Sequence, residues 1–141
     1  MKLTLYSDYS LRVLMYLANR NQLAQIDDIA KFYNISKNHL TKIVHNLVNL
    51  GYVTSIRGRG GGIMLKTNPE DINVGALIRQ TEENFTLVEC FDPETNTCPL
   101  IDHCGLQSVL GEALTAYINV LDQYTVADVT PGYRIQKEEH S

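Results

Sequence analysis

Three cysteines have the most distinctive chemistry in this chain, and they lie close together in the sequence. Cys90, Cys98 and Cys104 are separated by seven and five residues, with Pro93, Pro99 and several polar residues between them. Proline and short polar side chains are typical of loops, and one loop can bring three thiols to one point. Because an odd number of clustered cysteines cannot all pair as disulfides, a different chemistry is indicated.

The chemistry that best suits three neighbouring thiolates is metal binding. Thiolates repel one another unless a cation neutralises them, which favours a bound metal or an iron–sulfur cluster. An iron–sulfur cluster usually has four thiolate ligands, so three would leave one iron to a different ligand. Zinc could take Asp102 or His103 as its fourth ligand, but the closely paired cysteines of common structural zinc sites are missing. The spacing favours an iron–sulfur cluster and leaves zinc or free thiols as alternatives.

The length and composition are those of a single domain, or of a small domain with an extended arm. The chain has 141 residues, and no apolar run approaches the roughly 20 residues that a membrane-spanning helix needs. The start of the chain, MKLTLYSDYS, lacks the apolar core of a signal peptide. We therefore expect a cytoplasmic protein with no membrane partner, whose thiols stay reduced and available to a metal.

The charged residues are distributed unevenly, although the net charge is only −4. Residues 31–66 contain no acidic residue and six basic ones, namely Lys31, Lys37, Lys42, Arg57, Arg59 and Lys66. Residues 67–141 contain thirteen acidic residues and three basic ones. A basic block within an acidic protein indicates a local surface that binds a polyanion.

Three helices are predicted in the first part of the chain, and the third begins the basic block. Sequence patterns place them at about 7–20, 26–33 and 37–50, with Ser7 and Ser36 as N-caps. Apolar residues in the third helix repeat at intervals of three and four and predict a buried face: Leu40, Ile43, Val44 and Leu47. The opposite face carries hydrogen-bonding or cationic side chains and no acid, which suits base edges and phosphates.

A short hairpin is predicted to follow the third helix. Strands at 52–56 and 63–65 flank the segment 57–62, whose sequence is RGRGGG. Since this segment leads from strand to strand rather than into a helix, it is a hairpin tip that can approach DNA closely. Three helices and a basic hairpin predict a winged helix-turn-helix that binds double-stranded DNA. The predicted DNA-contacting residues are Ser36, Lys37, Asn38, Thr41, Lys42, His45, Arg57, Arg59 and Gly60.

The rest of the chain is predicted to be helical, which makes the fold mainly α with one small β-hairpin. A helix at about 74–82 precedes the cysteines, and a long helix runs from about 104 to 123. The long helix carries an apolar stripe with steps of four and three: Leu106, Leu110, Ala113, Tyr117, Val120 or Leu121, and Tyr124. We predict that this stripe forms a homodimer interface; the alternative is packing against its own domain.

These elements predict three parts in the chain. Residues 1–82 are expected to form the winged helix-turn-helix domain, residues 83–129 the cysteine loop and dimerisation helix, and residues 130–141 a disordered tail. A symmetric dimer presents two recognition helices, so we expect a pseudo-palindromic DNA operator.

Several segments together resemble a known family of regulators. They are YSDYSLRVLMYLA near the start, SKNHLTKIVHNL in the third helix, GYVTSIRGRGGGI across the hairpin, EDINVGALIRQTE, the three-cysteine loop and YTVADV. Nearly all of residues 1–130 are similar to the iron–sulfur winged-helix repressors that include IscR and NsrR, and most similar to the NsrR type. The resemblance implies a dimeric repressor that holds an iron–sulfur cluster on the three cysteines and senses nitric oxide. The implied cluster is [4Fe–4S], with [2Fe–2S] as the alternative.

The resemblance also bears on the fourth ligand of such a cluster. IscR-type members have a histidine three residues after the third cysteine, where this chain has Gln107. In NsrR-type members the ligand corresponds to Asp8 of the partner subunit, and this chain has Asp8 in the matching SDY context. An acid in the first turn of a helix is also favoured by the helix dipole alone. The seven residues between Cys90 and Cys98 exceed the five that are common in the family.

Other functions remain open on the sequence alone. Within DNA binding, the alternative is a winged-helix regulator stabilised by zinc or switched by thiol oxidation. In a different class, it is a ferredoxin-like electron carrier or a protein-interaction module. We do not expect an enzyme, because the sequence contains no recognisable set of nucleophile, base and orienting group.

Overall fold

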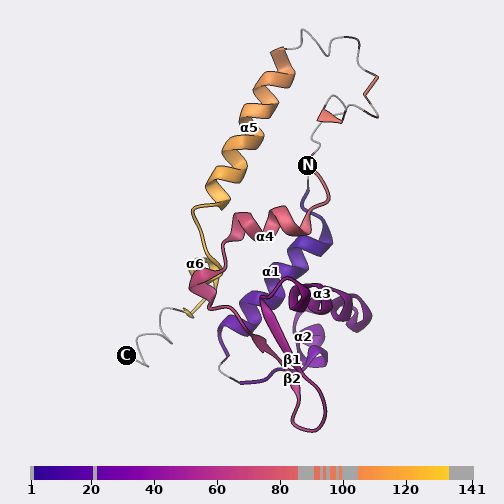
Figure 1. Cartoon of the computed structure of the whole chain (residues 1–141), viewed down its shortest axis with the longest axis vertical. Helices are drawn as coiled ribbons and strands as arrows, with labels where there is room; N and C mark the ends of the chain where they lie inside the picture. Colours follow the sequence, from indigo (N-terminus) through magenta and orange to yellow (C-terminus); the bar gives the residue numbers. More distant parts are fainter. Residues whose placement is uncertain are drawn as a thin grey trace.

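The computed structural model describes residues 2–20, 22–85, 91, 92, 94, 96, 97, 99 and 105–133. Its elements are α1 (Leu5–Ala18), α2 (Ile26–Tyr33), α3 (Lys37–Asn49), β1 (Val53–Ile56), β2 (Gly62–Leu65), the 3-10 helix η1 (Pro69–Asp71), α4 (Val74–Thr81), α5 (Gly105–Leu121) and α6 (Val126–Val129). Figure 1 shows α5 extending away from a body that contains the other elements. The predicted fold class, mainly α with one hairpin, is confirmed. None of the described helices is long and apolar enough to cross a membrane.

One apolar core holds α1, α2 and α3 together. Its fully buried side chains come from all three helices and include Leu14, Leu17, Ile29, Leu40, Ile43 and Leu47. The apolar face of α3 therefore points inward as its spacing predicts, and each such side chain contributes about 1.5–3 kcal/mol on burial. Asn34, with a φ of 56°, adopts the left-handed conformation that ends α2 and starts the turn to α3.

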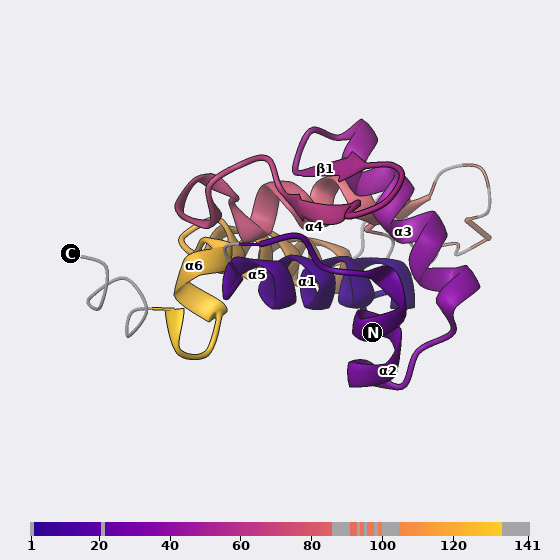
Figure 2. The same cartoon turned by 90° about the horizontal axis from the view of Figure 1, so that it is seen from below.

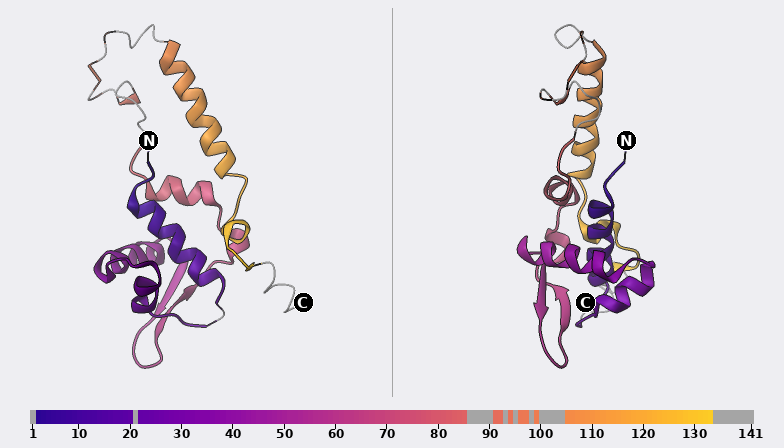
Figure 3. Two further views of the ribbon diagram at one scale, coloured as in Figure 1. Left: turned by 180° about the vertical axis from the view of Figure 1, so that it is seen from behind. Right: turned by 90° about the vertical axis from the view of Figure 1, so that its right-hand side faces the viewer.

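Strands β1 and β2 form a two-stranded antiparallel hairpin after α3, and we call residues 53–65 the wing. The paired positions run from Val53 opposite Leu65 to Ile56 opposite Gly62. Val53 enters the core, whereas residues 57–60 at the tip are exposed. Figure 3 shows the wing and α5 projecting from opposite ends of the body. The core thus fixes the base of the hairpin and leaves its basic tip free to approach a partner.

The chain returns from α5 to the body through α6, a helix that was not predicted from the sequence. Thr125 starts α6 with a capping box, in which its hydroxyl accepts from the Asp128 N–H and the Asp128 carboxylate accepts from the Thr125 N–H. Val126 is fully buried, and its N–H donates to the Ile72 carbonyl (2.8 Å). Figure 2 shows α6 at one end of α1 and α3 toward the other. The YTVADV segment therefore anchors the C-terminal end of α5 to the body.

The predicted start of the first helix is wrong. α1 begins at Leu5, and its N-cap is Thr4, whose hydroxyl accepts from the Ser7 N–H. Ser7 is instead fully buried, and its hydroxyl lies 2.7 Å from that of Thr81. Serine is a favoured N-cap residue, but a partner 74 residues away determines the place of Ser7.

The first residues of the predicted disordered tail are ordered in the structure. Thr130 is buried, and its hydroxyl donates to the Val126 carbonyl (2.5 Å). Tyr133 packs against the core. Residues 130–133 therefore belong to the packed structure, and residues 134–141 lie outside the described residues.

Candidate nucleic-acid interface and cysteine segment

The face of α3 that points away from the core presents the predicted DNA-contacting side chains. They are all exposed: Lys37, Asn38, Thr41, Lys42 and His45. Ser36 caps the helix, since its hydroxyl accepts from the His39 N–H (3.4 Å). The Thr41 hydroxyl donates back to the Lys37 carbonyl (2.8 Å), which orients its methyl group and leaves its oxygen as an acceptor. Such a face can read base edges and hold phosphates.

Lys37, a cation of this face, forms an ion pair with Asp27 of α2. The Lys37 Nζ lies 3.2 Å from the Asp27 Oδ1, and the two side chains are 59% and 55% exposed. Exposed ion pairs contribute about 0–1 kcal/mol, so a DNA phosphate can displace Asp27. A DNA contact through Lys37 would therefore exchange one anionic partner for another.

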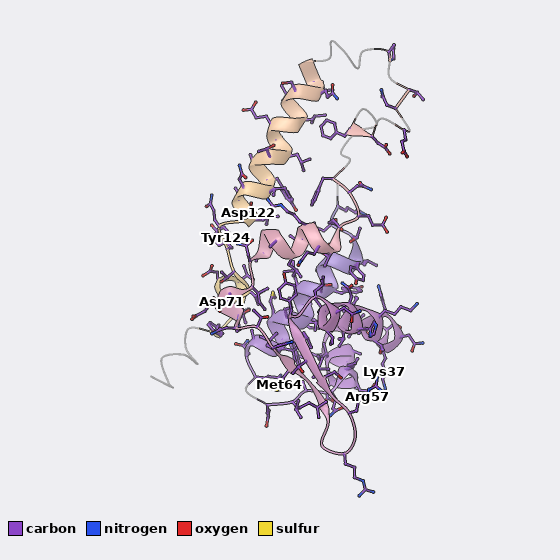
Figure 4. The ribbon with its side chains drawn as sticks, in the orientation of Figure 1. Lys37, Arg57, Met64, Asp71, Asp122 and Tyr124 are labelled. Atoms are coloured by element: carbon purple, nitrogen blue, oxygen red, sulfur yellow. The ribbon has the colours of Figure 1, made fainter. Side chains whose placement is uncertain are left out.

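The wing tip adds a second group of cations at the same end of the molecule. Arg57 and Arg59 are exposed, as are Gly58 and Gly60 between and beside them. Figure 4 shows Lys37 and Arg57 near this end, away from the end of α5. A polar helix face beside a basic hairpin suits B-DNA, with the helix in the major groove and the tip along the backbone or in the minor groove.

The predicted metal ligands of the loop lie outside the described residues: Cys90, Cys98 and Cys104, together with Asp102 and His103. These residues belong to the stretch 86–104, which we call the cysteine segment. In the sequence it follows Phe85, after α4, and precedes Gly105, at the start of α5. Across the part of the chain that is described, no three His, Cys, Asp or Glu side chains are grouped to hold a metal. The cysteine ligand set therefore stays a prediction.

Asp8, the predicted fourth ligand, lies in the first turn of α1. Its carboxylate accepts two hydrogen bonds from Arg12, at 3.0 and 3.3 Å. Arg12 also lies against the rings of Tyr9 and Tyr33, with its guanidinium carbon 5.6 and 5.7 Å from their centroids. Asp8 is 40% exposed, so its pairing with Arg12 is a weak surface interaction that a stronger ligand can replace. Whether Asp8 binds iron also stays a prediction.

A polar cluster near Asp8 joins the start of α1 to the end of α4. The Glu82 carboxylate accepts from the Thr4 N–H (3.1 Å), the Thr4 hydroxyl and the Ser7 hydroxyl (2.9 Å). The Ser7 hydroxyl also contacts that of Thr81. We call these four residues the α1–α4 clamp. The clamp lies only a few residues before the cysteine segment, so it links that segment to α1 and hence to the core beneath α3.

The clamp predicts a dependence of stability on pH. Burial alone raises the pKa of Glu82, but the hydrogen bonds from Thr4 and Ser7 outweigh burial and leave this pKa below its ordinary value. A carboxyl group whose pKa is lowered on folding stabilises the fold above its unfolded pKa, and this stabilisation is lost as the pH falls through the folded pKa. We expect Glu82→Gln to lower the thermal midpoint at neutral pH and to narrow the difference from the parent below about pH 4. Glu83→Gln, a change at the exposed neighbouring residue, is the control, and equal pH profiles for Glu82→Gln and the parent would contradict a role for the clamp.

A second cluster holds α5 to α4, and we call its residues, Asn73, Gly75, Arg79 and Asp122, the α4–α5 junction. Arg79 and Asp122 form a two-bonded ion pair, one bond being 2.7 Å, which lowers the pKa of Asp122. The Asn73 side chain donates to the Asp122 carbonyl (2.7 Å). A Cβ on Gly75 would lie 1.9 Å from the Asp122 Oδ1. This junction was not predicted from the sequence, in which a glycine within a helix is its local signal.

Comparison with known proteins agrees with this architecture. The family model Rrf2, described as an iron-dependent transcriptional regulator, matches residues 3–132. The chain belongs to the Rrf2 family. This Rrf2 protein is 59% identical over 131 residues to the HTH-type transcriptional regulator NsrR of Bacillus licheniformis, which covers 92% of each chain. It is 56% identical over 131 residues to the HTH-type transcriptional regulator NsrR of Bacillus subtilis, covering 92% of this chain and 90% of that one.

The fold is also similar to that of a solved structure. A transcriptional regulator from Listeria innocua superposes on this Rrf2 protein with a TM-score of 0.74 at 32% identity, covering 92% of this chain and 85% of that chain. The predicted family resemblance is therefore confirmed. The prediction that the protein is a DNA-binding regulator and not an enzyme is confirmed as well, because its family and relatives are transcriptional regulators.

Proposed function

We propose that this protein is a homodimeric repressor whose affinity for DNA depends on an iron–sulfur cluster that responds to nitric oxide. Cys90, Cys98 and Cys104 would hold the cluster, most simply [4Fe–4S], with Asp8 of the partner subunit as the fourth ligand. Three soft thiolates fit iron, and a carboxylate is a harder ligand that would be the easiest to displace. When bound, the cluster would supply iron atoms with which nitric oxide can react.

The observation that carries this proposal is that the helices on both sides of the cysteine segment are attached to the body of the protein. On one side, α4 ends in the α1–α4 clamp, where Glu82 binds Thr4 and Ser7. On the other side, the segment leads into α5, whose far end is fixed at the α4–α5 junction. A change in the conformation of the segment therefore pulls on α1, which packs against α3. Asp8 adds a second connection, since it lies on α1 itself.

The surface of α5 supports a dimer. Within this helix only Ile118 is buried, and it faces α4 in a groove lined by Arg79, Phe85 and Leu114. The opposite side leaves large apolar side chains exposed, namely Leu106 (62%), Val109 (60%) and Val120 (52%). Packing against the body thus accounts for one side of α5. Of the predicted stripe it leaves Leu106 and Val120 exposed and Leu110, Tyr117 and Leu121 half-buried. A second copy of this chain is the partner that a closed twofold symmetry would provide.

The proposed DNA contacts make a prediction about salt. Lys42→Ala and Arg59→Ala should each weaken operator binding and lower the slope of log affinity against log salt by about one unit per lost phosphate contact. Asn38→Ala and His45→Ala should instead relax sequence preference, because their side chains suit base edges. Binding titrations at several salt concentrations measure both effects. If all four variants bound operator like the parent, this face of α3 and the wing would not be the DNA-binding surface.

The whole proposal is tested with protein purified without oxygen. The expected preparation is coloured, contains iron and sulfide, and sediments as a dimer at micromolar concentration. Duplexes selected by this protein from a random pool should contain inverted repeats, and treatment with nitric oxide should release them. Zinc in place of iron and sulfide would indicate the zinc-stabilised alternative, and binding that changes only on thiol oxidation would indicate the thiol switch. A monomer with and without the cluster would contradict the dimer.

A further inference from the structure

The base of the wing is bound by a side chain from outside the hairpin. The ladder between β1 and β2 ends at the pair Ile56–Gly62, so the carbonyl of Gly61 lies just beyond it. The Gln25 Nε2 donates a hydrogen bond to this carbonyl at 2.6 Å. Gly61 is itself buried, and a buried carbonyl that loses its partner is costly. Gln25 therefore completes the hydrogen bonding at the point where the wing leaves the body.

The backbone next to this hydrogen bond is also held closely against neighbouring backbone. Ala24 and Ile63 exchange two backbone hydrogen bonds, each of 2.8 Å. A Cβ on Gly62 would lie 2.7 Å from the Ala24 carbonyl oxygen, and one on Gly61 would lie 2.2 Å from that of Ile56. Two of the glycines in the wing are thus required by close approach of the backbone, in addition to the freedom they give to the tip. Ala24 therefore forms an isolated antiparallel bridge with Ile63 of β2.

Gln25 also lies at the start of α2, so its hydrogen bond to Gly61 links the wing to this helix. It is the N-cap residue of α2, yet its side chain makes no cap bond to that helix. N-cap side chains usually accept from the first turn of their own helix, and glutamine is a poor residue for that role. The Gln25 carboxamide instead donates a hydrogen bond to the Gly61 carbonyl in the wing. Because α2 packs against α3 in the core, Gln25 connects the wing to the helix that reads DNA.

We propose that Gln25 is a positioning residue for DNA recognition, which fixes the wing relative to α3 so that Arg57 and Arg59 meet the DNA backbone while α3 occupies the groove. This inference rests on the proposed function, since it requires the wing to contact DNA. An open cavity of about 350 Å³ lies between the wing and the start of α2, and its lining includes Gln25, Asp27, Lys37, Ser55 and Gly60. Without the Gln25 bond, this space lets the tip move toward α2 and away from a DNA partner.

Replacement of Gln25 by methionine is the most direct test, because methionine keeps the length of the side chain and removes the donor. Gln25→Met should weaken operator binding about three- to tenfold, the range that one hydrogen bond supports. Amide hydrogen exchange at residues 60–63 should become faster. The exposed Gln22 lies three residues before Gln25, and Gln22→Met is the matched control, with operator affinity and exchange like those of the parent. A Gln25→Met variant with parental affinity would overturn the inference.

A double-mutant cycle separates positioning of the wing from a general loss of stability. In a background with Arg57→Ala and Arg59→Ala, the tip has no cations to position, so adding Gln25→Met should cause little further loss of affinity. An equal loss in both backgrounds would overturn the inference, because Gln25 would then act without the wing. If Arg57→Ala and Arg59→Ala themselves left binding unchanged, the proposed contact between wing and DNA would fail. If they weakened binding and Gln25→Met did not, only the positioning role would fail.

Discussion

Alanine in place of Cys98 is expected to abolish cluster assembly, whereas alanine in place of His103 is expected to leave the cluster intact. Three thiolates already fall one short of the usual four, so the loss of another leaves too few ligands to hold iron and sulfide. Cys90→Ala and Cys104→Ala should behave like Cys98→Ala. Iron and sulfide content after purification without oxygen, together with visible absorption, measures the effect. A zinc site would give the opposite pattern for His103→Ala, with loss of zinc and no sulfide in the parent.

The same measurements test the fourth ligand. Asp8→Ala should retain iron and sulfide, but its visible circular dichroism should shift because one iron changes its ligand. If Asp8 of the partner subunit connects the cluster to α1, its loss should also reduce the change in operator affinity on nitric oxide treatment, a coupling of about 1–3 kcal/mol. Asp28→Ala, at another exposed first-turn acid, is the control. An unchanged spectrum and an unchanged affinity ratio for Asp8→Ala would leave Asp8 with only its ion pair to Arg12.

Alanine in place of Gly75 is expected to destabilise the protein by about 1–3 kcal/mol, whereas a glycine-to-alanine change within a helix normally stabilises it. The added Cβ would lie 1.9 Å from the Asp122 Oδ1 and 2.9 Å from the Asp122 backbone nitrogen. The side chain of Asp122 can rotate away only by giving up Arg79, and the backbone contact remains. Chemical unfolding of Gly75→Ala beside the parent measures the loss.

Measuring Gly75→Ala in an Asp122→Ala background shows whether the α4–α5 junction causes the loss of stability. Asp122→Ala removes the side-chain contact and the exposed ion pair, and the loss of an exposed pair by itself should have little effect on stability. In that background Gly75→Ala should be less damaging, since only the contact with the backbone nitrogen remains. Strict additivity of the two changes would mean that Gly75→Ala acts elsewhere. A normal stability for Gly75→Ala alone would contradict the close packing of α4 against the end of α5.

The parts of the fold that were predicted correctly are those whose signals are local. The apolar repeat of Leu40, Ile43 and Leu47 identifies the inner face of α3 because helical spacing alone puts these side chains on one side. The glycines of the wing likewise identify a hairpin, since the segment joins two strands. In the same way, the acid-free stretch of residues 31–66 identifies the end of the molecule that carries exposed cations.

The features that the sequence did not predict all depend on partners far along the chain. Ser7 looked like a cap because serine is a good cap, but Thr81 and Glu82 determine its place. Helix α6 is only four residues long, which is too short for a periodic pattern, and it is stabilised by burial of Val126. Gln25 gave no signal, because the carbonyl that it binds becomes available only where the hairpin ladder ends. Tertiary packing decided each of these cases.

The attachment of α5 at one end gives it the mechanics of a lever. The helix has 17 residues, about 25 Å at a rise of 1.5 Å each, and its fulcrum is Asp122. Over that length, a rotation of about 5° at the fulcrum moves the opposite tip by about 2 Å. That tip begins at Gly105, directly after Cys104. If the proposed cluster binds Cys104, its ligand distances would be sensitive to very small angular changes at the body, and the stiffness of the lever would increase sharply when two such helices brace each other.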